Sequence, residues 1–227
     1  MTVTAYGKGA TEAVDQAADE ISRLDQLLST GNEDSEIYKI NQSGDGILSE
    51  ETAYLVERSL DLYEATDGAF DIAIYPVMKA WGFTDDNFRV PDADELKYLL
   101  TLTDASDISY DKETSQIAFK KDGMQIDFGG IAKGYTSARI MDIFRACGIK
   151  SGLVNLGGNV QALGTKKDGS NWRVAVQDPQ DTDQYLGVLS IQDKAVITSG
   201  GYERYFEQDG RTSTSIRKCR APSRSCV

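Results

Sequence analysis

The chain has 227 residues, a formal net charge of −12 at pH 7 and no histidine. Its length and its 40% hydrophobic content suffice for one substantial core or for two lobes that share a cleft. The acidic balance disfavours a nucleic-acid partner, because a phosphate backbone is bound by an excess of Lys and Arg on one face. The lack of histidine excludes Ser-His-Asp and Cys-His catalysis and the common zinc sites. Carboxylates, hydroxyls, Lys, backbone groups and hard metal ions remain.

The sequence contains no apolar run of about 18 residues, which a membrane span would need. Its first residues alternate like a strand and do not resemble a signal peptide, so any leader of an exported product is expected to be missing here. The three cysteines, Cys147, Cys219 and Cys226, lack the CxxC spacing of zinc and redox sites.

Hydrophobic periodicity predicts the elements of the first half. They are a strand at 2–6, a helix at 9–29, a short turn or helix at 35–41, a helix from 49 to 66, a loop region with Pro76, Trp81 and Gly82, and a short helix at 91–100.

The second half changes from helical to strand patterns. The predicted elements are two or three short antiparallel strands within 107–128, a helix that follows Asp127-Phe-Gly-Gly and ends at Gly148, and strands at 152–156, 160–164, 172–177, 186–191, 195–198 and 202–207. The mixture predicts an α+β or layered α/β fold with helical hairpins and a mainly antiparallel sheet.

Residues 211–227 differ in composition from the rest of the chain. They hold five basic side chains, no acidic one and almost no apolar periodicity. This stretch does not look like part of the same fold.

The segment Asp127-Phe-Gly-Gly-Ile-Ala-Lys133-Gly-Tyr135 places a carboxylate at a strand end, two glycines at a turn and a lysine in the first turn of a helix. Free amides, the helix dipole and Lys133 would form a local anion site in an acidic protein. An equally simple interpretation is a tight connection in which Asp127 caps the helix.

Three further glycine-containing segments each have two interpretations. Asp67-Gly-Ala-Phe-Asp71 is either a contact for a polar ring or a helix C-cap with a left-handed Gly68. Asn155-Leu-Gly-Gly-Asn is either a place of close ligand approach around a buried amide or a bulge or hairpin. Thr198-Ser199-Gly-Gly is either an oxygen-rich ligand loop or an ordinary turn.

The order and spacing of these segments closely resemble the FAD:protein FMN transferase (ApbE) family over residues 1–212. The likeness rests on the segments at 67–71, 126–135, 155–159 and 195–200, together with Pro76, Trp81-Gly-Phe and Tyr202-Glu-Arg. It implies two lobes with FAD in the cleft between them. It also implies a single domain at 1–212 that is incomplete at its C-terminal end. The composition of residues 213–227 predicts a disordered basic tail.

The resemblance implies Mg²⁺-dependent transfer of the FMN half of FAD to a threonine of an acceptor protein, with release of AMP. Some members instead hydrolyse FAD to FMN and AMP. Members are exported and lipid-anchored, so an anchor upstream of this chain and an extracytoplasmic, membrane-anchored location are expected. Phosphoryl transfer needs positioning and charge neutralisation more than covalent help, so the lack of histidine is no obstacle.

The resemblance also implies the roles of individual residues. Asp127 would hold the ribose or adenine of FAD, the carbonyl of Ala132 would coordinate Mg²⁺, and Lys133 would lie near the diphosphate. Asp127 and Lys133 are the expected catalytic pair. The other expected FAD contacts are Asp67, Ala69 and Phe70 in the pocket, and Asn41, Thr198 and Ser199 at its edge.

Two departures from the family pattern affect the expected activity. Met1 lies beyond a flavin contact that precedes the first strand, and Ser213-Thr-Ser-Ile-Arg-Lys-Cys-Arg replaces a His-Ile-Asp-Pro-x-Thr-Gly segment. A frameshift or a truncated gene would explain the second. Because a cation held by one carbonyl is weakly bound, this chain is expected to transfer FMN poorly. A non-catalytic FAD-binding protein and an incomplete fragment are the alternatives.

Overall fold

The computed structural model describes residues 1–181, 183–198, 205–208 and 211–214. The chain divides into two compact units, and each unit is formed by two separate stretches of the sequence. We call residues 1–27 and 131–200 the sheet unit, and residues 28–130 and 201–227 the helical unit.

The sheet unit is built on an antiparallel sheet with the strand order β1-β5-β6-β9. The strands are β1 (Thr2–Tyr6), β5 (Ser151–Asn155), β6 (Asn159–Gly164) and β9 (Ala195–Ile197). The first strand of the chain therefore pairs with a strand about 150 residues later, with Thr2 opposite Asn155.

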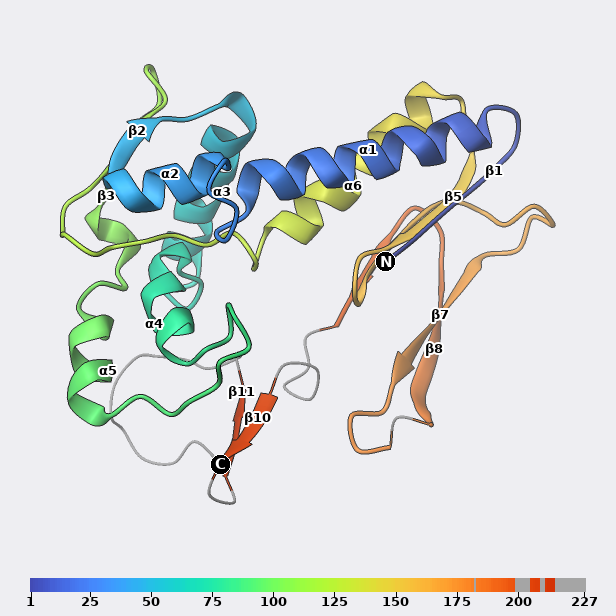
Figure 1. Cartoon of the computed structure of the whole chain (residues 1–227). Coiled ribbons are helices and arrows are strands. Elements are labelled where there is room, and N and C mark those ends of the chain that lie inside the picture. Colours follow the sequence, from blue (N-terminus) through green and yellow to red (C-terminus); the bar gives the residue numbers. More distant parts are fainter. Residues whose placement is uncertain (182, 199–204, 209–210, 215–227) are drawn as a thin grey trace. The chain divides into compact units, whose positions relative to one another are not determined.

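Helices α1 (Ala10–Leu28) and α6 (Ala132–Ala146) lie against this sheet, as Figure 1 shows. Helical spacing puts Ala13 and Ala17 of α1, and Ile140 and Phe144 of α6, on the faces that enter the core. They pack on strand residues that include Val154. Gly152 allows this packing, because a Cβ there would lie 2.6 Å from Cε2 of Phe144.

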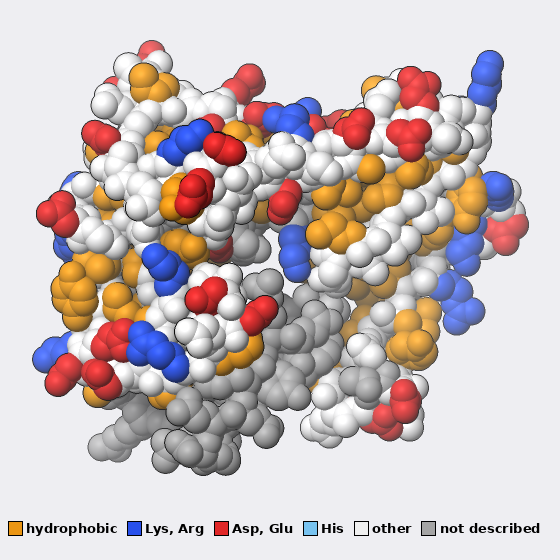
Figure 2. Space-filling view, in the orientation of Figure 1, with side chains coloured by type: hydrophobic (Ala, Val, Ile, Leu, Met, Phe, Trp, Pro, Cys, Tyr) orange, Lys and Arg blue, Asp and Glu red, His pale blue; other side chains and the backbone are white. Residues whose placement is uncertain are grey.

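A ribbon of β7 (Trp172–Gln177) and β8 (Tyr185–Ile191) completes the sheet unit. Trp172 and Ile191 join a small second core. Other apolar side chains of β8 are exposed, and Figure 2 shows hydrophobic side chains over the ribbon.

The helical unit contains short elements around a three-stranded antiparallel sheet of order β2-β4-β3. Its helices are α2 (Glu36–Ser43), α3 (Glu50–Ala65), α4 (Tyr75–Ala80) and α5 (Ala93–Leu100), with 3₁₀ turns η1 (Ile72–Ile74) and η2 (Ala105–Asp107). Its strands are β2 (Asp45–Ile47), β3 (Ile108–Asp111), β4 (Gln116–Phe119), β10 (Tyr205–Gln208) and β11 (Arg211–Thr214).

The predicted fold class is confirmed, and the boundaries of most elements agree to within a few residues. The predicted loop around Pro76 is wrong, because η1 and α4 occupy it. Pro76 lies in the first turn of α4. A backbone N–H has no hydrogen-bond partner within the helix at this position, so proline, which lacks the N–H, is tolerated there. The 107–128 region holds two strands, and the third strand of that sheet is β2.

The expected tail at 213–227 is described only at its start. Ser213 and Thr214 belong to β11, whose backbone pairs with β10, and residues 215–227 lie outside the described residues. The domain boundary at 212 and the disorder of the tail stay predictions. Across the described parts of the chain, no helix is both long and apolar enough to cross a membrane.

Candidate functional site

The predicted site residues fall in both units. Asn41, Asp67, Ala69, Phe70 and Asp127 belong to the helical unit, and Ala132, Lys133 and Thr198 belong to the sheet unit. Ser199 lies outside the described residues. The expected cleft between two lobes stays a prediction, and each half of the site is described separately.

In the helical unit, Asp127 lies in a segment that the surrounding backbone holds in place. Its N–H donates to the carbonyl of Ile72, at 2.9 Å. The residue before it, Ile126, is bound on both its N–H and its carbonyl by the side chain of Asn41. Asp127 itself is half-buried.

The carboxylate of Asp127 binds a backbone amide of the glycine turn. Its Oδ1 accepts from the N–H of Gly129 at 2.8 Å, and the N-cap residue of α6, Ile131, makes no side-chain cap hydrogen bond. The carboxylate thus holds the turn at the glycine pair. The capping interpretation and the ligand interpretation both stay predictions.

Phe70 lies against this turn. A Cβ on Gly130 would be 2.9 Å from Cε2 of Phe70, so the ring and the glycine backbone are in close contact. The segments at 67–71 and 127–130, far apart in the sequence, thus meet within one unit.

The turn at Asp67 and Gly68 also ends α3, as the C-cap interpretation predicts. Both residues have positive φ, 50° and 69°, and the N–H of Gly68 donates to the carbonyl of Tyr63 at 2.8 Å. Asp67 and Ala69 are exposed. The cap and a ligand contact are compatible, and the contact stays a prediction.

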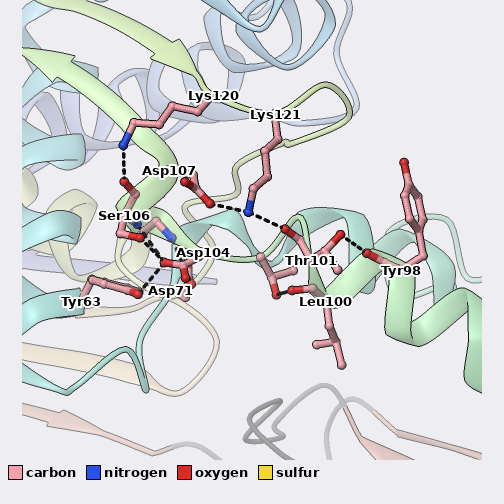
Figure 3. A network of polar contacts seen from close by, with 12 residues as sticks. Tyr63, Asp71, Tyr98, Leu100, Thr101, Asp104, Ser106, Asp107, Lys120 and Lys121 are labelled. Atoms are coloured by element: carbon pink, nitrogen blue, oxygen red, sulfur yellow. Dashed lines mark hydrogen bonds and ion pairs between the residues drawn. The ribbon is translucent and has the colours of Figure 1, made fainter.

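A polar network fixes the residues that follow this turn. Asp71 accepts from the N–H of Ala73 at 2.8 Å and from the N–H of Ala105 at 3.3 Å, so one carboxylate joins the starts of η1 and η2. Figure 3 shows Tyr63 and Ser106 donating to Asp104 beside it.

In the sheet unit, three of the predicted segments meet at the β5–β6 turn. Lys133 Nζ donates to the carbonyl of Gly157 at 3.3 Å. The N–H of Thr198 donates to the carbonyl of Gly158, also at 3.3 Å. Lys133, Gly157 and Thr198 are exposed, so an ammonium group, a glycine turn and a hydroxyl are open to solvent together.

The glycine pair is a tight hairpin turn, as one of the two interpretations predicts. Gly157 and Gly158 have φ of 61° and 84°, and the N–H of Gly158 donates to Oδ1 of Asn155 at 3.1 Å. The buried amide is that of Asn159, which sequence reasoning did not single out. It is 4% exposed, and its Oδ1 has no hydrogen-bond partner among the described residues.

The described residues do not by themselves form a magnesium site. Ala132 is half-buried in the first turn of α6. No group of three or more Asp, Glu or Cys side chains in the described ranges could hold a metal ion. One carbonyl is too small a ligand set for a hard cation, which takes six or more oxygen ligands.

Comparisons with known proteins agree on one family. The sequence profile of the ApbE family matches residues 1–220. FAD:protein FMN transferases of Klebsiella pneumoniae and Treponema pallidum are each 34% identical to this chain, over 84% and 92% of its length. These matches span 60% and 63% of the relatives, so the chain corresponds to about six tenths of their length.

Solved structures show the same fold. The ApbE protein of Thermotoga maritima superimposes with a TM-score of 0.89 at 31% identity, over 96% of this chain and 71% of that one. The apo flavinyl transferase ApbE of Pseudomonas stutzeri gives 0.81 at 29% identity, over 95% and 67%.

Proposed function

The chain belongs to the ApbE family, and on this basis we propose that it binds FAD and transfers the FMN moiety to a threonine of an acceptor protein. The threonine oxygen attacks the phosphorus of the FMN half and loses its proton. The P–O bond of the diphosphate breaks, and AMP leaves. The names of the relatives support FAD as the donor and a protein as the acceptor.

The observation that carries the proposal is the cluster of Lys133, the β5–β6 glycine turn and Thr198. The protein is acidic overall, so a diphosphate needs a local source of positive potential. The exposed side chain of Lys133 lies in the first turn of α6, whose N-cap residue, Ile131, makes no side-chain cap hydrogen bond. Charge and helix dipole at one place favour a phosphate anion. In the helical unit, Asp127 is the proposed contact for the ribose or adenine.

Magnesium is part of the proposal as an ion that neutralises the diphosphate charge. The carbonyl of Ala132 is its one proposed ligand in the described part of the chain. Because that set is too small, we expect weak Mg²⁺ binding and slow transfer by this polypeptide. Isothermal titration with MgCl₂ in the presence of FAD would measure the affinity.

The experiment that tests the proposal supplies FAD, Mg²⁺ and an acceptor with a single threonine. Intact-mass spectrometry should detect a small fraction of acceptor that carries one FMN, and chromatography should detect an equal amount of AMP. An acceptor with valine in place of the threonine is the control. An acceptor that stays unmodified while FAD remains intact after prolonged incubation would contradict transferase activity.

A second candidate function is a non-catalytic FAD-binding protein, which the lack of a metal cluster in the described residues favours. FAD fluorescence quenching without AMP release would support it. AMP release that is equally fast without an acceptor would instead indicate hydrolysis of FAD. The proposed exported, lipid-anchored location rests on the family resemblance, and fractionation of the source cells would test it.

A further inference from the structure

Residues 124–128 alternate in burial as a strand does, but they pair with no strand among the described residues. Met124, Ile126 and Phe128 are at most 2% exposed and alternate with the half-buried Gln125 and Asp127. Backbone groups at such a place need hydrogen-bond partners, which a neighbouring strand would normally supply. Residues 124–128 belong to none of the sheets formed by the described residues.

The side chain of Asn41 supplies these partners. Its Oδ1 accepts from the N–H of Ile126 at 2.7 Å, and its Nδ2 donates to the carbonyl of Ile126 at 2.9 Å. The carbonyl of Asn41 also accepts from Nε2 of Gln125, at 3.2 Å. A side-chain amide has the same donor and acceptor as a peptide group, so it can replace one residue of an antiparallel partner.

Asn41 is itself firmly held. It is 8% exposed and follows the buried Ile37 and Ile40 on α2. Ser35 caps the start of α2 by accepting from the N–H of Tyr38 at 2.9 Å. The amide therefore projects from a fixed helix, and both of its polar groups are used by Ile126.

The next residue along the segment is Asp127, which a second element holds. Its N–H donates to the carbonyl of Ile72 at 2.9 Å, and Asp71 fixes η1 through Ala73. Ile126 is thus held by a residue of α2, and Asp127 is held by a residue of η1. The position of the Asp127 carboxylate depends on both attachments.

We propose that Asn41 is a positioning residue, whose amide takes the place of a strand partner for Ile126 and so sets the position of the Asp127 carboxylate for FAD. The role in FAD binding rests on the proposed function. It differs from the role that the family resemblance implies for Asn41, which is a direct contact at the edge of the FAD pocket.

The first test compares Asn41→Ala with the wild type in the absence of FAD. Hydrogen–deuterium exchange at the N–H groups of Ile126 and Asp127 should accelerate, because one partner is lost and the segment is released. Asn41→Asp, which keeps the size and the acceptor but loses the donor, serves if the alanine variant does not fold. Thr52→Val is the control, because Thr52 is also a buried polar residue of the same unit, but its hydroxyl accepts from Ser49.

The second test is a double-mutant cycle on FAD affinity. Asn41→Ala should weaken FAD binding about 10- to 100-fold, as a misplaced contact group does. In the Asp127→Asn background, Asn41→Ala should weaken FAD binding by less than threefold, because the carboxylate that it misplaces is already absent. Thr52→Val should leave FAD affinity unchanged.

Other outcomes overturn the proposal in distinguishable ways. Weaker FAD binding with unchanged exchange would make Asn41 a direct ligand contact. Faster exchange with additive losses of affinity in the cycle would show that Asn41 affects FAD binding independently of the Asp127 carboxylate. A wild-type chain that binds no FAD in the same titration overturns the proposed function, and with it the role of Asn41 in FAD binding. Unchanged exchange overturns the proposal that the Asn41 amide replaces a strand partner for Ile126.

Discussion

At the scale of single residues, the candidate site combines backbone that is held by hydrogen bonds with polar side chains that are half-buried or exposed, as Asp127 and Lys133 show. The N–H of Asp127 donates to the carbonyl of Ile72, and its carboxylate accepts from the N–H of Gly129. Lys133 is exposed and has a carbonyl partner in Gly157. Such residues can change their ligand contacts without opening the core.

Asp127→Asn should reduce FAD affinity markedly, by about tenfold or more, while the melting temperature changes by only a few degrees. The amide keeps an oxygen for the N–H of Gly129 but loses the charge that strengthens a hydrogen bond to a ribose or adenine group. Fluorescence titration with FAD and thermal unfolding measure the two quantities. An unchanged dissociation constant would show that Asp127 stabilises the glycine turn and does not contact FAD.

At the scale of elements, close packing between α6 and the sheet explains why one glycine cannot be replaced and another can. A Cβ at Gly152 would lie 2.6 Å from Cε2 of Phe144 and 3.2 Å from the carbonyl oxygen of Thr4. A Cβ at Gly134, within α6, would meet nothing within 4 Å.

Gly152→Ala should therefore destabilise the protein by about 1–3 kcal/mol, the usual cost of overpacking. Gly134→Ala should stabilise it by up to about 1 kcal/mol, because alanine is the better helix former. Urea unfolding of the two variants and the wild type checks both signs. Equal stability of the two variants would contradict the packing argument.

The two helices of the sheet unit are also joined by charge. Glu20 of α1 accepts from Arg23 at 2.8 Å and from Arg139 of α6 at 3.1 Å. The hydrogen bond from Arg23, with further help from Arg139, lowers the pKa of Glu20 below its ordinary value of 4.5, although burial opposes this. The ionised form is therefore favoured in the folded state.

A lowered pKa in the folded state stabilises the protein above the unfolded pKa, and the stabilisation is lost as the pH falls through 4.5 toward the folded pKa. Glu20→Gln should remove this part of the acid sensitivity. Unfolding free energies of the variant and the wild type should differ most at neutral pH and converge below the folded pKa. A difference that does not depend on pH would assign the effect to packing.

At the scale of the whole molecule, each unit is assembled from distant parts of the chain. The sheet unit takes residues 1–27 and 131–200, so its four-stranded sheet is complete only when β1, from the start of the chain, pairs with β5. Ligand binding should report on this assembly, because a nucleotide that binds only the folded state raises its stability.

FAD at about 100 times its dissociation constant should add about 2.7 kcal/mol. For a chain of this size that corresponds to a rise in melting temperature of roughly 5–10 °C. Differential scanning calorimetry with FAD, and with riboflavin as a control that lacks the diphosphate, measures the shift. Equal shifts with both ligands would argue against a diphosphate site at Lys133.

The sequence alone determined the local features of this protein. Periodicity placed the helix that includes Ala13 and Ala17, glycine positions placed the β5–β6 turn, and the order of the motifs indicated the ApbE family. These signals are local because propensity, capping and turn geometry act over a few residues.

The tertiary structure decided which of these segments contact one another. The sequence could not show that the carboxylate of Asp127 accepts from the N–H of Gly129. It could not show either that the amide of Asn41 binds Ile126, 85 positions away. Nor could it place β2 beside β4, or Phe70 against Gly130. Such pairings depend on packing between segments distant in the chain, where many partners are chemically equivalent and only the assembled core selects one.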